Sequence, residues 1–142
     1  IISNPLYGKL FTNTFAMLYG QTTISSSANS NFPNGQTPSN YIDDTSAALI
    51  LRPKTLESYA TDALNLREAL ALQQDSYAKL TLPVTIMSGD EDNVTPNKIH
   101  SYKLHNDISH SKLIKVSGVA HSIPELKPSL IKIEIEKLLK DK

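Results

Sequence analysis

Two short turns carry the residues of this sequence whose types and spacing are best suited to chemistry. In GDED, residues 89–92, and in GVAH, residues 118–121, a glycine ends an apolar run and a functional side chain follows three positions later: Asp92 in the first, His121 in the second. A carboxylate that accepts a hydrogen bond from one imidazole nitrogen fixes the histidine tautomer and stabilises the imidazolium, which leaves the other nitrogen to act as a base. The pair therefore predicts general-base chemistry at His121, oriented by Asp92.

The segments before these two turns predict buried strands of a parallel sheet. LPVTIMSG, residues 82–89, is a short apolar run, continuous rather than alternating and rich in β-branched residues. SKLIKVSG, residues 111–118, predicts a second strand of similar length. The segment 96–108 between them predicts a helix, which makes a strand–helix–strand crossover with parallel strands. Because the carboxyl ends of parallel strands lie at one edge of a sheet, the two turns are expected to meet there. The expected fold class is α/β.

The remaining segments predict helices and one long irregular stretch. Residues 53–79 have apolar residues at helical spacing, with Thr55 as the expected N-cap. The last segment, 128–142, alternates like a strand in part, but its length, Pro128 and the Glu136–Lys140 spacing favour a helix. Residues 20–47 are dominated by Ser, Asn, Thr, Gly and Pro and predict a polar loop.

Composition narrows the classes of function. The 142 residues include 14 basic and 14 acidic residues and no cysteine, which disfavours nucleic-acid binding and excludes disulfides, thiolate metal sites and a cysteine nucleophile. No segment is apolar enough to predict an integral membrane span, and a cytoplasmic location is the default expectation. No cofactor or metal is expected: His100, His105 and His110 are five residues apart and would not share a helix face, and residues 90–101 lack the glycine and final glutamate of a calcium loop.

With both turns in place, the sequence resembles the C-terminal half of an α/β-hydrolase-fold enzyme. In that family a G-x-x-D turn after a late strand carries the acid of the catalytic triad, and a G-x-x-H turn after the last strand carries its histidine. The resemblance implies that Asp92 is the acid and His121 the general base. It further implies that residues 80–142 are the C-terminal strand–helix–strand–helix part of the core, and that residues 1–79 resemble the helical cap or lid of the family, including the loop at about 20–47. The implied activity is that of a serine hydrolase, esterase- or lipase-like, acting on a small ester or acyl substrate.

The nucleophile of that family is missing from the sequence. Its G-x-S-x-G motif, which lies upstream of the cap, does not occur among the 142 residues. The resemblance therefore implies a fragment, or one part of a split protein, whose partner is the missing N-terminal half of the same fold. The chain by itself is expected to be poorly soluble or partly disordered, because the strand at 82–88 would have an unpaired apolar edge, and to be inactive.

Several alternatives stay open at this level. Asp90 could be the acid, with Asp92 as a helix-capping residue, and His121 could be structural. An aspartate nucleophile, as in epoxide hydrolases and dehalogenases, would use the same late Asp and His, and tyrosines such as Tyr41 and Tyr59 in the cap-like part are compatible with that chemistry. The chain could also be a non-catalytic remnant or an interaction module. The sequence does not identify the substrate or the oligomeric state.

Overall fold

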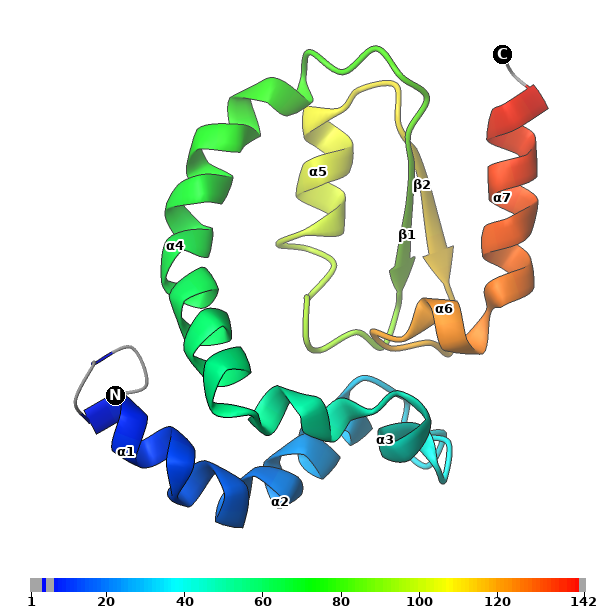
Figure 1. Cartoon of the computed structure of the whole chain (residues 1–142). Helices are drawn as coiled ribbons and strands as arrows, with labels where there is room; N and C mark the ends of the chain where they lie inside the picture. The colour runs from blue at the N-terminus through cyan, green and yellow to red at the C-terminus, as the bar shows by residue number, and fades with distance from the viewer. Residues whose placement is uncertain (1–3, 5–6, 141–142) are drawn as a thin grey trace. The chain divides into compact units, whose positions relative to one another are not determined.

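A computed structural model describes residues 4 and 7–140 of the chain. The structure divides into two compact units. The helical unit comprises residues 1–29 and 37–74, and the sheet unit comprises residues 30–36 and 75–142. Each unit is described by itself below, with the elements as labelled in Figure 1.

The helical unit consists of short helices and most of one long helix. Its elements are α1 (Tyr7–Asn13), α2 (Phe15–Ser30), α3 (Tyr41–Asp44), the 3₁₀ helix η1 (Ala47–Leu51) and α4 (Pro53–Tyr77). Gly20 allows α2 to approach η1 closely, because a Cβ atom at this position would overlap the side chain of Leu51. Thr12 and Ala16 are among its buried residues.

The prediction of a loop over residues 20–47 was wrong for its first part. Residues 20–30 belong to α2, and residues 41–44 form α3. The hydroxyl groups that suggested a loop are accommodated within the helix: Thr23 Oγ1 donates to the Tyr19 carbonyl at 3.2 Å and Ser25 Oγ donates to the Gln21 carbonyl at 3.0 Å. Serine and threonine can satisfy their hydroxyls in this way at helical i−4 carbonyls, so their abundance alone does not exclude a helix.

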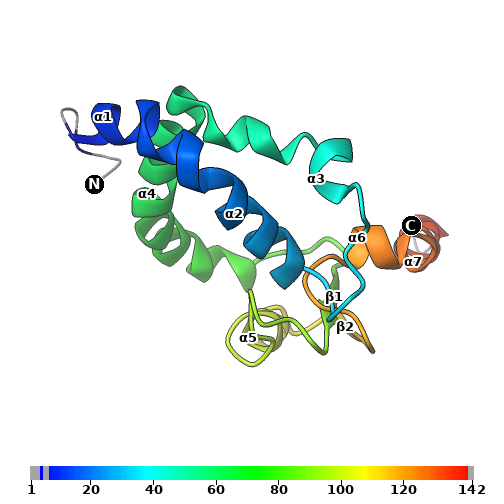
Figure 2. The same cartoon turned by 90° about the horizontal axis from the view of Figure 1, so that it is seen from below.

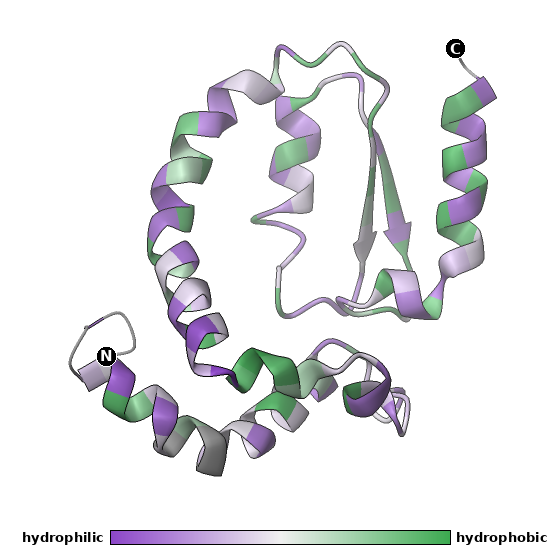
Figure 3. Ribbon diagram, viewed as in Figure 1, coloured by the Kyte–Doolittle hydropathy of each residue, from purple (hydrophilic) through white to green (hydrophobic). Residues whose placement is uncertain are grey.

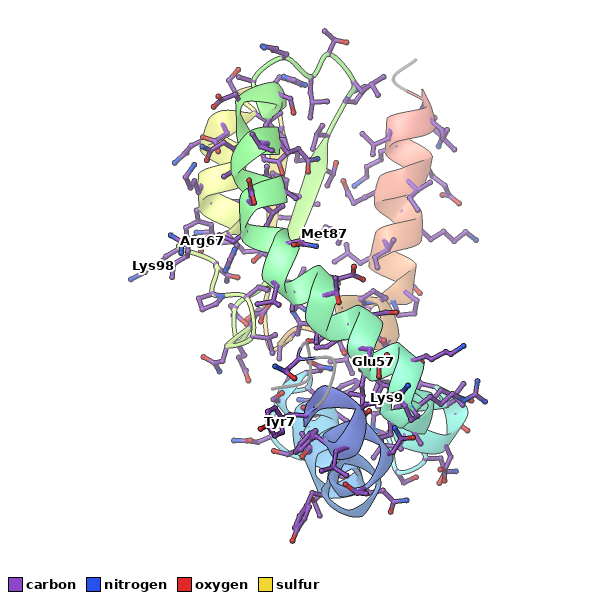
Figure 4. The ribbon with its side chains drawn as sticks, turned by 60° about the vertical axis from the view of Figure 1, so that its left-hand side comes forward. Tyr7, Lys9, Glu57, Arg67, Met87 and Lys98 are labelled. Atoms are coloured by element: carbon purple, nitrogen blue, oxygen red, sulfur yellow. The ribbon has the colours of Figure 1, made fainter. Side chains whose placement is uncertain are left out.

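Helix α4 confirms the predicted helix of residues 53–79 in type and in most of its length. It begins at Pro53 rather than after Thr55, because proline, which lacks an N–H, is favoured at the first helical position. Polar side chains such as Glu57 and Arg67 project from it (Figure 4). Apolar and polar residues alternate along the whole helix (Figure 3), and several of its leucines, including Leu64 and Leu72, are exposed.

The sheet unit contains the predicted strand–helix–strand–helix sequence. Its elements are β1 (Thr85–Gly89), α5 (Ser101–Asp107), β2 (Lys112–Val116), α6 (Ile123–Leu126) and α7 (Pro128–Lys140). β1 and β2 are parallel, with Thr85 opposite Lys112 and Gly89 opposite Val116. α5 and α7 lie on opposite sides of this two-stranded sheet (Figures 1 and 2). This mixed α/β arrangement confirms the parallel strands and the final helix predicted from the sequence.

Helix α5 is shorter than predicted, and the short helix α6 was not predicted. The expected helix over 96–108 begins only at Ser101, because residues 92–100 form turns closed by side chains and by the Pro96 carbonyl, which accepts from the Ile99 and His100 N–H groups. The strands are also shorter than expected. Pro83 has no N–H to contribute to a ladder, and the strand begins two residues later at Thr85.

An apolar core lies between the α7 side of the sheet and the segment that carries His121. Val116, Val119 and Ile123 form its buried centre, and the partly buried residues packed against it are Met87, Ile114, Leu126, Leu130 and Ile131. Met87 comes from β1 and is labelled in Figure 4. Val119 is fully buried, so the chain between β2 and His121 is anchored by apolar packing as well as by hydrogen bonds.

Candidate active site

The turn after β1 and the turn after β2 are in direct contact. A Cβ atom added at Gly89 would overlap the carbonyl oxygens of Val119 and Ala120, so only glycine allows the two turns to come this close. Gly118 has a positive φ of 67°, the left-handed conformation that glycine adopts without strain. The two glycines therefore have different roles: one permits a close approach, and the other permits a sharp turn before His121.

Backbone hydrogen bonds join the two turns. The Asp90 N–H donates to the Val116 carbonyl at 3.1 Å, and the Glu91 N–H donates to the Val119 carbonyl at 3.0 Å. The side chain of Asn97 donates to the Gly89 carbonyl at 2.8 Å and accepts from the Ser88 hydroxyl. The two backbone bonds continue the pairing of β1 with β2 beyond the last residues of the strands, and the bonds of Asn97 attach the segment after Asp92 to the end of β1.

Asp92 and His121 form a hydrogen-bonded pair at this edge of the sheet. Asp92 Oδ2 lies 3.0 Å from His121 Nδ1. The Asp92 side chain is 8% exposed and the His121 side chain is 41% exposed. Within the described part of the chain, His121 Nε2 forms no hydrogen bond. The imidazole is thus held at one nitrogen by a buried carboxylate and presents its other nitrogen for a further interaction.

Every hydrogen bond that Asp92 accepts favours its ionised form. Oδ1 accepts from the N–H groups of Val94 and Thr95, both at 2.9 Å, and Oδ2 accepts from the Thr95 hydroxyl at 2.7 Å. Burial is the largest single influence on this carboxyl and would raise its pKa, but the hydrogen bonds from Thr95 and His121 together outweigh it. The pKa of Asp92 therefore lies below its ordinary value of 3.8, and Asp92 is an anion at neutral pH.

Asp90 binds the opposite turn rather than the imidazole. Its Oδ2 accepts from Ser117 Oγ at 2.9 Å, and its Oδ1 accepts from the Gly118 N–H at 2.8 Å. The pKa of Asp90 is lowered, chiefly by the hydrogen bond from the Ser117 hydroxyl. Asp90 therefore connects the turn after β1 to the turn that precedes His121.

The two residues singled out from the sequence, Asp92 and His121, thus lie together, and Asp90 does not take part in their hydrogen bond. Asp92 Oδ1 closes a local turn; it does not cap a helix, as the alternative had it, because the next helix begins nine residues later at Ser101. The two oxygens of Asp92 have separate partners, so the turn and the contact with His121 coexist. Glu91 is exposed.

Sequence reasoning missed three polar residues that build the site. Thr95, Asn97 and Ser117 each contact one of the two turns through a side chain. Asx and Ser/Thr turn motifs, in which a side chain bonds to the backbone two or three residues away, could have indicated the Asp92–Thr95 contact. The bonds of Asn97 to β1 and of Ser117 to Asp90 join residues eight or more positions apart, and no local pattern marks them.

His105 and His110 have side-chain partners outside this site. His105 Nδ1 lies 2.8 Å from Ser111 Oγ, and His110 Nε2 lies 2.9 Å from the Leu82 carbonyl oxygen. Among residues 4 and 7–140, no group of three or more histidine, aspartate or glutamate side chains has an arrangement that could hold a metal ion. Over the same residues, no helix combines the length and apolar character needed to cross a bilayer.

Comparison with known proteins finds a similarity to a hydrolase of Bacillus subtilis. The chain is 30% identical over 69 residues to YugF of Bacillus subtilis (strain 168), described as an uncharacterized hydrolase. The match covers 49% of this chain and 25% of the relative, so the chain spans about a quarter of the relative's length. No model of a protein family matches the chain, and no solved structure matches it. The comparison supports a relationship to a hydrolase in general terms.

Proposed function

We propose that residues 80–142 supply the acid and the histidine of a serine hydrolase active site of the α/β-hydrolase type. In this proposal His121 is the general base, Asp92 orients it, and the substrate is a small ester or a similar acyl compound. The observation that carries the proposal is the contact of 3.0 Å between Asp92 Oδ2 and His121 Nδ1, formed at the carboxyl ends of two adjacent parallel strands. A carboxylate on Nδ1 leaves Nε2 to accept a proton from a nucleophile.

The geometry divides the work of such a reaction among residues of this chain. Asp92 is buried and held at both oxygens, so it can orient the imidazole without itself moving. His121 would take the proton from the attacking hydroxyl at Nε2, and the imidazolium so formed would be stabilised by the carboxylate 3.0 Å from Nδ1. The same nitrogen would then return the proton to the leaving group. The partial exposure of the His121 side chain leaves room for this exchange.

The nucleophile in this proposal is a serine outside the 142 residues, in a segment that carries the other strands of the fold. β1 has one neighbour, β2, in the described sheet, so its other edge is where a further strand would pair. The relationship to a protein named as a hydrolase supports the reaction class. In the same proposal, residues 1–79 serve as the cap of the active site and the substrate is an ester.

The test is to label the nucleophile in the protein expressed from its native gene, together with all coding sequence that adjoins these 142 codons. A fluorophosphonate probe reacts with a serine that a histidine activates. We expect one labelled serine in the wild-type protein and in His110→Ala, the matched control, and loss of labelling in His121→Ala. Labelling that persists in His121→Ala would contradict the role of His121.

The same experiment distinguishes the serine hydrolase from the two alternative functions, an enzyme with an aspartate nucleophile and an interaction module. Absence of a labelled serine, combined with turnover of an epoxide or a haloalkane, would assign an aspartate nucleophile to the site. Absence of both labelling and turnover would contradict the enzyme proposal as a whole and would leave an interaction role.

A further inference from the structure

The hydroxyl group of Thr95 lies between the two members of the acid–histidine pair. Thr95 Oγ1 is 2.7 Å from Asp92 Oδ2 and 3.3 Å from His121 Nδ1. Asp92 Oδ2 and His121 Nδ1 are themselves 3.0 Å apart. The three polar atoms therefore form a closed triangle in which each lies within hydrogen-bonding distance of the other two.

Counting protons assigns a direction to each bond of this triangle. An ionised carboxylate only accepts, and a hydroxyl has one proton to donate and lone pairs that accept. Because the pKa of Asp92 is lowered, its carboxylate is charged at neutral pH and the Thr95 proton is donated to Oδ2. The lone pairs of Thr95 Oγ1 are then free to face the ring, where only an N–H can approach them favourably. Both neighbours of Nδ1 are thus acceptors, which places a ring proton on Nδ1 and, in the neutral imidazole, makes Nε2 the nitrogen that accepts.

The backbone holds Thr95 in this position independently of the imidazole. Its N–H donates to Asp92 Oδ1 at 2.9 Å, so Asp92 and Thr95 are joined by a backbone bond at one carboxylate oxygen and by a side-chain bond at the other. The hydroxyl is therefore held in place without any contribution from His121. A group that positions another side chain needs to be preorganised in this way.

We propose that Thr95 is a positioning residue of the site: its hydroxyl holds Asp92 Oδ2 and accepts from His121 Nδ1, so that the imidazole keeps one tautomer and one orientation. It acts through Asp92 and His121 and does not touch reacting atoms. The catalytic meaning of this role rests on the function proposed above, but the triangle itself is a property of the folded chain and can be measured without turnover.

The test is NMR of the protein expressed from its native gene and labelled with ¹⁵N-histidine. The readouts are the ring nitrogen shifts of His121, which report the tautomer, and the exchange rate of its Nδ1 proton with water. Thr95→Val removes the hydroxyl at nearly constant shape, Thr95→Ala removes it with less bulk, and Thr95→Ser retains it. Thr85→Val, at the far end of β1 from Gly89, is the matched control, and His121→Ala assigns the signals.

We expect the Nδ1 proton to exchange about fivefold faster in Thr95→Val and Thr95→Ala, the effect of losing one ordinary hydrogen bond. Thr95→Ser and Thr85→Val should match the wild type. An unchanged exchange rate in either folded variant without the hydroxyl, or failure of Thr95→Ser to match the wild type, would overturn the proposal. Absence of hydrolysis would leave these signals unaffected and would count against the proposed function alone.

Discussion

Replacing Gly89 by alanine should displace the turn that carries His121 while leaving the rest of the sheet unit folded. The added Cβ would overlap the carbonyl oxygens of Val119 and Ala120, both of which are backbone atoms and cannot rotate away. Restoring ordinary contact requires the two turns to separate by about 1 Å. His121 follows Ala120 directly, so this movement is passed to the imidazole and lengthens its contact with Asp92.

The size of the effect follows from this displacement. A misplacement of about 1 Å in a group that positions reactants can lower turnover about 10²-fold, and overpacking of this kind costs on the order of 1–3 kcal/mol in stability. Gly35→Ala is the matched control, because Gly35 has a positive φ of 77° and nothing within 4 Å of an added Cβ. Alanine there loses about 1–2 kcal/mol through backbone strain alone.

The assay compares the two variants in stability and at the site. Urea denaturation should give losses of similar size for Gly89→Ala and Gly35→Ala. Only Gly89→Ala should alter the Nδ1 signal of His121 and, in the protein expressed from its native gene, lower turnover about 10²-fold. Equal effects of the two variants on the His121 signal would refute the argument that the contact of Gly89 with the opposite turn positions the imidazole.

Three further predictions concern the carboxylates. Asp90→Ala should lower the melting temperature more than Ser117→Ala, because Asp90 still accepts from the Gly118 N–H when Ser117 is replaced. The double variant should melt no lower than Asp90→Ala, and additive losses would show that Asp90 and Ser117 do not act as one pair. In the protein expressed from its native gene, Asp92→Asn should lower kcat on the order of 10⁴-fold and Asp90→Asn much less. A loss below about tenfold in Asp92→Asn would show that Asp92 is not the acid of the triad. The pKa of Glu134, lowered chiefly by its bond to Lys112, predicts a stabilising contribution that is present above about pH 4.5 and is lost as the pH falls through the folded-state value. Denaturation at a series of pH values should show a smaller loss in Glu134→Gln than in the wild type, because Asp90 and Asp92, whose pKa values are also lowered, remain in the variant.

The sequence predicted the elements of the sheet unit because their patterns are local. The apolar runs before Gly89 and Gly118 and the spacing of residues 128–140 identify two strands and a helix, and parallel pairing follows from the helix between the strands. The three-residue spacing from each glycine was enough to bring Asp92 and His121 to one edge of the sheet. Their hydrogen bond is a consequence of that topology.

What could not be predicted depends on contacts between distant residues or on competition between conformations of similar energy. The segment 20–30 is rich in Ser and Thr, which favour loops by local propensity, yet their hydroxyls bond to helical carbonyls in α2. The bond between Asp90 and Ser117 joins residues 27 positions apart. Asp90 therefore stayed open as an alternative acid at the level of the sequence, whereas in the structure its carboxylate binds the opposite turn.

The central claim is that His121 is the base of a hydrolase active site. The most direct test is the steady-state kcat/KM for a small chromogenic ester, measured on the protein expressed from its native gene, for wild type, His121→Ala and His110→Ala. We expect a loss on the order of 10⁴-fold or more for His121→Ala and a value within about twofold of wild type for His110→Ala. Hydrolysis that survives in His121→Ala would contradict it.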